Sequence, residues 1–352
     1  MASPPVDPVD PTVPAPAQAL REIGFWLERE RADSYRVKAY RGAADALDAL
    51  PTEDLAALQE ADAWADVPGL GRSTVAVIRE SLAGRLPQRL AELRRAGARP
   101  LADSGLRHLV RGDLHCHTTW SDGGSPLAEM AVTAERLGHD YLAITDHSPR
   151  LRVAHGLDAE RLAAQWREID RVQAALAERG SRLRLLKGIE VDILDDGSLD
   201  QSEQMLAGLD VVVASVHSKL RGDRDFMTRR LVAAVANPHT TVLGHCTGRL
   251  VEGSRGTRPP SDFDAEVVFE ACRQFDVAVE INSRPERQDP PDPLLALARD
   301  IGCRFSIDTD AHAPGQLDFL ALGCARAEAA GISPERIITT WPVDELLAFA
   351  AR

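Results

Sequence analysis

The pattern of apolar and polar positions changes near residue 110. From there on, short apolar runs rich in β-branched residues alternate with longer stretches in which apolar residues recur every three to four positions. The short runs predict strands at 111–115, 141–145, 184–190, 211–216, 241–245, 277–282 and 304–308. The longer stretches predict helices that include 126–138, 159–178, 227–236, 262–275 and 291–300. This alternation is typical of a parallel βα barrel, and seven strands indicate a relative of the eight-stranded barrel that lacks one unit.

Before residue 110, the apolar positions follow helical spacing only. A helical stretch is expected over 19–50, which contains no proline, and a shorter helix is expected over 53–61. A Gly-x-Gly turn at Gly69 and Gly71 opens another helix, which Gly84 closes. The predicted parts of the chain are a disordered tail at 1–17, a helical domain at 18–96, a linker at 97–108 and a barrel domain at 109–352.

The composition is that of a globular protein. With 352 residues, of which 44% are hydrophobic and 27% charged, the chain is long enough for two domains and can bury a sizeable core. No apolar run reaches the ~18 residues of a membrane span, and the proline-rich N-terminus lacks the basic and apolar segments of a secretory signal. The five cysteines form no C-x-x-C pair. These features predict a cytoplasmic protein with no disulfide framework and no membrane partner.

The net charge of −13 argues against binding nucleic acid through overall charge. The charge is unevenly distributed, however, because residues 72–107 contain eight arginines and only three acidic residues. Residues 111–352 contain 27 basic and 38 acidic residues. The sequence therefore predicts a basic patch near the front of the chain and an acidic body behind it.

Histidines and carboxylates gather at the ends of the predicted strands. Six of the ten histidines stand at or just after such an end: His115, His117, His147, His217, His245 and His312. Three carboxylates occupy comparable places, namely Asp122, Glu190 and Asp310. Because the C-terminal ends of barrel strands converge on one face, we expect a divalent-metal site there, and imidazole with carboxylate suits Zn²⁺, Mn²⁺ and Fe²⁺ alike. The histidines that end no strand are expected to be ordinary polar residues: His108, His139, His155 and His239.

The order of motifs from 111 to 340 resembles that of the PHP (polymerase and histidinol phosphatase) superfamily of metallo-phosphoesterases. The matching motifs are His-x-His followed by Ser-Asp-Gly, then Thr-Asp-His-Ser, an isolated Glu after Gly-Ile, Ser-Val-His-Ser, Gly-His and Asp-x-His. The resemblance implies a distorted seven-stranded barrel that holds three divalent metal ions. It implies one ion held by His115, His117, Glu190 and Asp310, a second held by Glu190, His217 and His245, and a third held by Asp122, His147 and His312.

Two stretches are similar to the PHP domain attached to bacterial X-family DNA polymerases. They are GHCTGRLV at 244–251 and EINSRPERQD at 280–289. Arg249 and Arg287 in these stretches are candidates for binding phosphate, because a guanidinium fork matches phosphate oxygens. Lys219, which follows the fourth predicted strand, is a further candidate for facing the site.

The front helices resemble the N-terminal helical domain of the same polymerases, in YRVKAYRGAADAL at 35–47 and DVPGLGRSTVAVIRESLAGRLP at 66–87. The second stretch is similar to a helix-hairpin-helix, whose glycines let backbone amides approach a DNA phosphate without reading the base sequence. The predicted DNA-binding residues are Gly69, Gly71, Arg72, Lys38, Tyr40 and Arg41. A simple helical hairpin without DNA contact is the alternative interpretation.

The chain departs from those polymerases in two ways. A linker of only about ten residues separates the front helices from the barrel, so the polymerase fingers, palm and thumb are absent and nucleotide polymerisation is excluded. In relatives with deoxyribose-phosphate lyase activity, the second hairpin helix carries a Schiff-base lysine. Here that helix reads RSTVAVIRE at 72–80, so lyase chemistry by that route is not expected.

These observations predict a metal-dependent phosphoesterase that acts on DNA ends, as a 3′–5′ exonuclease or a 3′-phosphatase with a role in DNA repair. Glu190 is expected to bridge two metals whose hydroxide attacks phosphorus, while Arg249 and Arg287 neutralise the developing charge. One alternative is a small-molecule phosphate monoesterase similar to histidinol phosphatase, which the acidic body favours because it repels polyanions. A DNA-binding adaptor with an inert barrel is another alternative, against which the nine intact ligands count.

Overall fold

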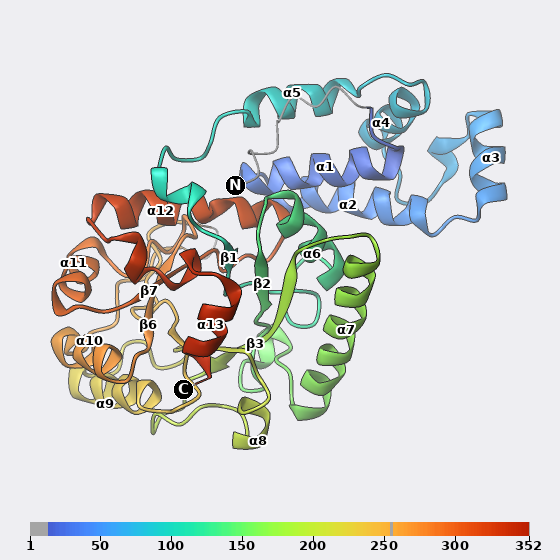
Figure 1. The fold of residues 1–352 in the computed structure, drawn as a ribbon. Coiled ribbons are helices and arrows are strands. Elements are labelled where there is room, and N and C mark those ends of the chain that lie inside the picture. The colour runs from blue at the N-terminus through green and yellow to red at the C-terminus, as the bar shows by residue number, and fades with distance from the viewer. Residues whose placement is uncertain (1–12, 254–255, 352) are drawn as a thin grey trace. The chain divides into compact units, whose positions relative to one another are not determined.

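The computed structural model describes residues 13–253 and 256–351, which divide into two compact units (Figure 1). The first unit ends at Pro100 and is entirely helical, whereas the second runs from Leu101 onward and contains every described strand. None of the described helices is long and apolar enough to cross a membrane.

The first unit is a set of helices around one central helix. It consists of α1 (Pro16–Arg29), α2 (Ser34–Asp48), α3 (Thr52–Ala61), a 3-10 turn (Trp64–Asp66), α4 (Arg72–Leu82) and α5 (Gln88–Gly97). On the apolar face of α1, Leu20, Ile23 and Leu27 are fully buried. The apolar sides of α2, α4 and α5 pack on this face and form the core of the unit.

The helical stretch predicted over 19–50 is in fact two helices. The chain turns at Arg31, which has a φ of 58°. Asp33 then caps α2, because its side chain accepts a hydrogen bond from the backbone amide of Tyr35 at 2.8 Å. This local cap stabilises a break that the apolar periodicity, which continues through it, does not reveal.

The glycine turn before α4 is formed as the sequence predicts. Gly69 has a φ of 88°, in the left-handed region that favours glycine. The hydroxyl of Thr74 accepts a hydrogen bond from the amide of Gly71 at 2.9 Å and so caps the first turn of α4. Gly84 follows the helix with a φ of 67°, and this conformation ends the helix.

The second unit is a seven-stranded parallel barrel, which confirms the predicted fold class. The strands pair in chain order: β1 (Gly112–Asp113), β2 (Tyr141–Ile144), β3 (Arg184–Asp192), β4 (Val211–Ser215), β5 (Val242–Leu243), β6 (Ala278–Asn282) and β7 (Phe305–Asp308). Cys116 and Ala311, which follow the first and last strands, also pair in parallel, so the barrel is nearly closed.

Strands β1 and β5 are shorter than predicted, because buried carboxylates bind the backbone amides that would otherwise continue the ladder. The amide of Leu114 donates to the side chain of Asp308 at 2.8 Å. In the same way, the amide of His245 donates to the side chain of Glu280 at 2.5 Å. The chain therefore leaves the regular sheet where the predicted ligands begin.

Helices follow the strands and cover the outside of the barrel (Figure 1). They are α6 (Leu127–Arg136), α7 (Ala159–Glu178), α8 (Glu203–Leu206), α9 (Arg224–Val235), α10 (Ala265–Gln274), α11 (Asp292–Ile301), α12 (Leu320–Ala329) and α13 (Val343–Ala350). Aspartate side chains cap the N-termini of α7, α9 and α10. Apolar side chains of the strands and of these helices form the core, in which all five cysteines are buried as free thiols.

Candidate metal centre

The nine predicted ligands meet at the C-terminal ends of the strands. They are His115, His117 and Asp122 after β1, His147 after β2, Glu190 in β3, His217 after β4, His245 after β5, and Asp310 and His312 after β7. Most of their side chains are buried, and the most exposed is Asp122, at 36%. Because the predicted ligands follow several different strands, the topology of the barrel brings them together. Proximity along the chain alone would not do so.

Glu190 lies in the middle of the cluster. Its Oε1 atom is 2.8 Å from Nε2 of His245 and 3.2 Å from Nε2 of His217. Its Oε2 atom is 3.4 Å from Nε2 of His115 and 3.5 Å from Nε2 of His117. Oε2 is also 2.8 Å from Nδ1 of His147. Each carboxylate oxygen thus faces its own group of imidazoles, two at Oε1 and three at Oε2, which is the arrangement that a bridge between two cations requires.

Two aspartates lie close to histidines that follow other strands. Oδ1 of Asp310 lies 3.4 Å from Nε2 of His117. Oδ1 of Asp122 lies 3.5 Å from Nε2 of His147 and 3.5 Å from Nε2 of His312. Each aspartate therefore adds a hard oxygen donor to nitrogen donors that come from other strands.

The donor atoms fit divalent cations. Four overlapping groups place one donor atom per residue within 4.8 Å of the others: His117 with Asp122, His147 and His312; His115 with His117 and Asp310; His115 with Glu190 and His245; and His147 with Glu190 and His217. Among the described residues, several of these atoms are buried without a hydrogen-bond partner, including both oxygens of Glu190 and Nε2 of His115, His217 and His245. Buried polar atoms without partners are rare, and coordination to a cation satisfies them. The groups could therefore hold metal ions.

The cluster contains ionised carboxylates together with histidines of two kinds, one with a lowered pKa and one with a raised pKa. Burial alone would raise the pKa of Glu190, but the surrounding histidines hold that pKa well below its usual value. Burial would also raise the pKa of Asp310, but two arginines and two histidines together hold it well below its usual value: Arg287, Arg284, His117 and His115. Burial lowers the pKa of His117 well below its ordinary value, whereas nearby carboxylates outweigh burial at His217 and raise its pKa to about 9. A cation bound beside His217 would take the place of that proton.

Two buried carboxylates behind the ligands were not selected by the sequence patterns. Glu280 in β6 lies 2.5 Å from Nδ1 of His115, and Asp192 in β3 lies 3.1 Å from Nδ1 of His217. A carboxylate on one ring nitrogen fixes the imidazole so that the other nitrogen points toward a cation. The sequence does carry a signal for them, because each is an acidic residue inside an apolar strand. Asp192 also lies two positions after Glu190, on the same face of β3.

The structure separates the two arginines that were predicted to bind phosphate. Arg287 is buried, and its Nε donates to Oδ2 of Asp310 at 2.8 Å. Arg249 instead donates from Nε to the carbonyl of Arg287 at 3.0 Å and from Nη2 to the carbonyl of Gln288. Arg284, which the sequence patterns did not select, donates to the carbonyl of Asp310 at 3.3 Å. Arg287 and Arg284 therefore border the ligands, whereas Arg249 holds the loop that carries them.

Lys219 forms an ion pair at the surface. Its Nζ lies 2.5 Å from Oδ2 of Asp195, and 60% of its side chain is exposed. Lys219 thus pairs with this aspartate. That Lys219 faces the site stays a prediction.

In the helical unit, the predicted DNA-binding residues fall into two groups. The exposed ones are Gly69, Gly71, Arg72 and Lys38. Tyr40 is only 7% exposed and belongs to the core. The guanidinium of Arg41 binds the carboxylate of Glu28 in α1, with Nη2 2.7 Å from Oε2. Tyr40 and Arg41 therefore join helices to one another, and the other four residues are the accessible ones.

Known proteins match both units. Residues 11–85 match the family model of a helix-hairpin-helix domain, and residues 113–283 match that of the PHP domain. The chain is 37% identical over 243 residues to the DNA polymerase/3'-5' exonuclease PolX of Bacillus subtilis. That match covers 69% of this chain and 41% of the relative, so the chain spans less than half of that protein's length.

Other relatives are aligned over most of their length. A probable phosphatase of Thermoanaerobacter sp. is 26% identical over 239 residues, and the probable phosphatase YcdX of Escherichia coli is 27% identical over 241 residues. These alignments cover 65% of this chain, and 89% and 90% of the two phosphatases. A solved structure of histidinol phosphate phosphatase from Lactococcus lactis, complexed with zinc, L-histidinol and phosphate, is 18% identical with a TM-score of 0.47. The superposition covers 64% of this chain and 95% of the other.

Proposed function

We propose that this chain, which belongs to the PHP superfamily of metal-dependent phosphoesterases, hydrolyses phosphate esters at the 3′ ends of DNA. The proposed activity is that of a 3′–5′ exonuclease, a 3′-phosphatase or both, with a role in DNA repair. One observation carries the proposal: a single chain combines a buried cluster of metal ligands, bordered by arginines, with a helix-hairpin-helix whose glycine turn is exposed. The relative named as a 3'-5' exonuclease supports the same reaction.

The nine ligands are proposed to hold three divalent cations. We assign His115, His117, Glu190 and Asp310 to one cation, Glu190, His217 and His245 to a second, and Asp122, His147 and His312 to a third. Mn²⁺, Zn²⁺ and Fe²⁺ all suit this mixture of imidazole and carboxylate. When bound, such cations supply Lewis acidity and a hydroxide nucleophile at neutral pH.

Glu190 is proposed to organise the reaction centre. Its Oε1 and Oε2 atoms face separate groups of histidines, so one carboxylate sets the separation of two cation positions. Its negative charge offsets part of the positive charge of the cations at both positions. The residue is 1% exposed, so water does not compete for its oxygens.

Arg287 is proposed to bind the substrate phosphate. Its Nε is used by Asp310, and the planar guanidinium carries further donors that pair well with phosphate oxygens. Its burial strengthens the attraction, because little water screens the charge. Arg249 is proposed as a positioning residue, since it donates to the carbonyl of Arg287 and holds that residue in place.

The helical unit is proposed to bind the DNA backbone without reading its base sequence. At Gly69 and Gly71, no atom lies within 4 Å of the place where a Cβ would stand, so a phosphate can approach the backbone closely. Lys38 and Arg72 supply exposed positive charge. Contacts of this kind are electrostatic and weaken as salt increases.

A small-molecule phosphate monoesterase is the second candidate. The acidic barrel sequence favours it, because negative charge repels a polyanion. The alignment over 89% and 90% of two probable phosphatases supports it as well. The two candidates differ in salt dependence, because DNA binding releases counterions and the binding of a small monoester does not.

The test compares two substrates on the full chain with Mn²⁺: a 3′-recessed duplex labelled at its 5′ end, and p-nitrophenyl phosphate. We expect shortened strands or loss of a 3′-phosphate, at a rate that falls steeply as salt rises. Glu190→Gln is the control for contaminating nucleases. Hydrolysis of p-nitrophenyl phosphate with intact DNA contradicts the DNA-end proposal and selects the monoesterase.

A further inference from the structure

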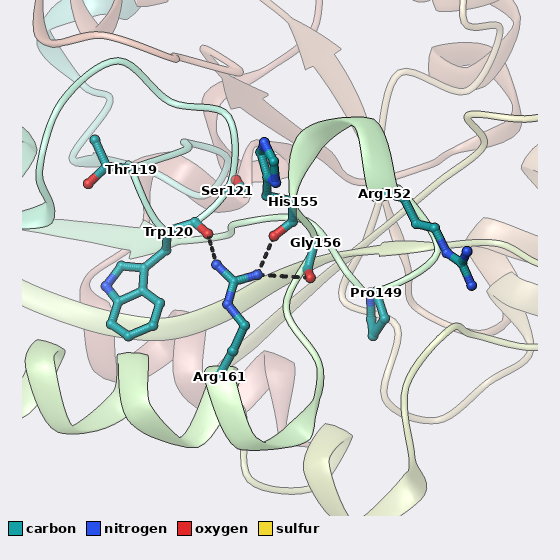
Figure 2. A pocket seen from close by; sticks show the side chains of 8 residues that line it. All are labelled: Thr119, Trp120, Ser121, Pro149, Arg152, His155, Gly156 and Arg161. Atoms are coloured by element: carbon teal, nitrogen blue, oxygen red, sulfur yellow. Dashed lines mark hydrogen bonds between the residues drawn. The ribbon is translucent and has the colours of Figure 1, made fainter.

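Beside the ligand cluster, the barrel contains a cleft of about 400 Å³ with a positively charged lining (Figure 2). Its walls are formed by 119–121 and by residues within 149–156, and Arg161 near the start of α7 joins them. Arg152 and Arg161 supply the charge, His155 adds ring nitrogens that can hydrogen-bond, and none of the described residues that line the cleft is acidic. In a chain with a net charge of −13, such a lining indicates an anionic ligand.

Both walls adjoin the metal ligands. The first wall lies along the chain between His117 and Asp122, and Oγ of Ser121 in this wall lies 3.5 Å from Oδ1 of Asp122. The second wall begins two residues after His147. An anion bound in the cleft would therefore lie next to a phosphate bound at the metal cluster.

Arg161 fixes the shape of the cleft. Its Nη1 donates to the carbonyl of Gly156 at 3.0 Å and to that of His155, and its Nη2 donates to the carbonyl of Trp120 (Figure 2). One guanidinium thus ties the two walls together, and among the described residues its side-chain donors meet carbonyls and no carboxylate. His155 has a φ of 56°, in a region that residues with a Cβ rarely adopt. The hydrogen bond from Arg161 to its carbonyl maintains that conformation.

Arg152 and His155 are the side chains available to a ligand. Both are exposed, and within the described part of the chain neither side chain forms an ion pair or a hydrogen bond. His155 follows no strand, so the pattern of strand ends did not select it. Its place in the cleft comes from the turn after β2 and from the bracing by Arg161.

We propose that this cleft binds the phosphodiester next to the scissile one in a DNA strand, through Arg152 and His155. The proposal rests on the proposed function, because it assigns the second phosphate of the same substrate. It predicts a preference for oligonucleotides over small monoesters, since only a strand presents a neighbouring phosphate. A small bisphosphate offers similar chemistry, and the experiment distinguishes it from a strand.

The experiment measures kcat and KM for Arg152→Ala, His155→Ala and the double variant of the full chain with Mn²⁺. For a single-stranded oligonucleotide at low salt, we expect the double variant to raise KM about tenfold and to leave kcat within about twofold, because charge-assisted contacts made in binding are lost. The slope of log KM against log salt is expected to fall by about 0.7 when the Arg152 contact is lost. KM for p-nitrophenyl phosphate is expected to stay unchanged. Arg171→Ala, which removes an exposed arginine of α7 outside the cleft, is the matched control.

The outcomes separate this proposal from the proposed function. If the wild-type chain degrades DNA and the double variant has the same oligonucleotide KM as Arg171→Ala, the cleft assignment is wrong and the DNA-end function stands. If the wild-type chain hydrolyses only p-nitrophenyl phosphate, the proposed function itself is wrong. A small bisphosphate is the third substrate. A higher KM for it in the double variant, with an unchanged oligonucleotide KM, overturns the assignment to a strand.

Discussion

The barrel and the helical unit differ in how the residues selected from sequence are placed in space. In the barrel, all nine residues selected at strand ends meet in one cluster. In the helical unit, Tyr40 and Arg41 were selected together with exposed residues, but they pack inside the unit. The cause is geometric: the strand ends of a closed parallel sheet converge, whereas a helix turns one face to the core and another to solvent. A short helical motif does not say which of its residues lie on which face.

The barrel cluster depends most on the carboxylate at its centre, which one substitution removes. We expect Glu190→Gln to lower phosphoesterase activity about a thousandfold and to release the two cations that it bridges. Initial rates with Mn²⁺ and metal content by mass spectrometry measure both effects. Glu178→Gln, which changes an exposed carboxylate at the end of α7, is the control. Full metal content and activity in Glu190→Gln would show that the cluster does not depend on this bridge.

In the helical unit, the largest expected effect is on stability. Arg41→Ala removes the guanidinium that binds the carboxylate of Glu28, a residue that is 6% exposed. Removing one partner of a buried ion pair costs about 3 kcal/mol, so we expect the free energy of unfolding to fall by that amount. Urea unfolding followed by circular dichroism measures it.

Lys38→Ala is the control for Arg41→Ala, because Lys38 is exposed on the same helix. Its free energy of unfolding is expected to change by no more than about 0.5 kcal/mol. If Arg41→Ala instead lost DNA binding at unchanged stability, Arg41 would be a DNA contact and the contrast between the two units would disappear.

A substitution at Glu280 tests whether the cluster extends beyond the ligands selected from sequence. Glu280→Gln keeps the size of the side chain and weakens its 2.5 Å hydrogen bond to Nδ1 of His115. We expect affinity for the cation at His115 to fall about tenfold, as measured by competition with a chelating indicator. Glu280→Asp retains the charge and is expected to recover part of the affinity. Equal affinity in the wild type and Glu280→Gln would restrict the functional centre to the nine ligands.

Much of the barrel is predictable from sequence, because its signals are local. The helix predicted over 159–178 has the same bounds as α7, whose N-terminus the side chain of Asp158 caps. The lengths of β1 and β5 are not predictable in this way. Their ends depend on Asp308 and Glu280, which come from other strands and bind their backbone amides.

The candidate site is predictable as far as the residues that stand at strand ends. Asp192 supports His217 from within β3, where only its polarity in an apolar strand distinguishes it. Arg249 and Arg287 were both selected as phosphate-binding candidates, but the path of their loops decides which guanidinium reaches a predicted ligand. Such paths are set by tertiary contacts, which the spacing of residues along the chain does not encode.

The smallest expected effect lies at Arg72, which is exposed at the first turn of α4 beside Gly71. Loss of one phosphate contact in Arg72→Ala is expected to weaken DNA binding a few fold and to lower the slope of log Kd against log salt by about 0.9 for duplex DNA. Fluorescence anisotropy in the inactive Glu190→Gln background measures both. Arg72→Lys is expected to restore the slope, because charge and not a fixed geometry carries this contact. An unchanged slope in Arg72→Ala would mean that the exposed turn does not meet DNA, and the helical unit would then share the fold of a helix-hairpin-helix without its binding surface.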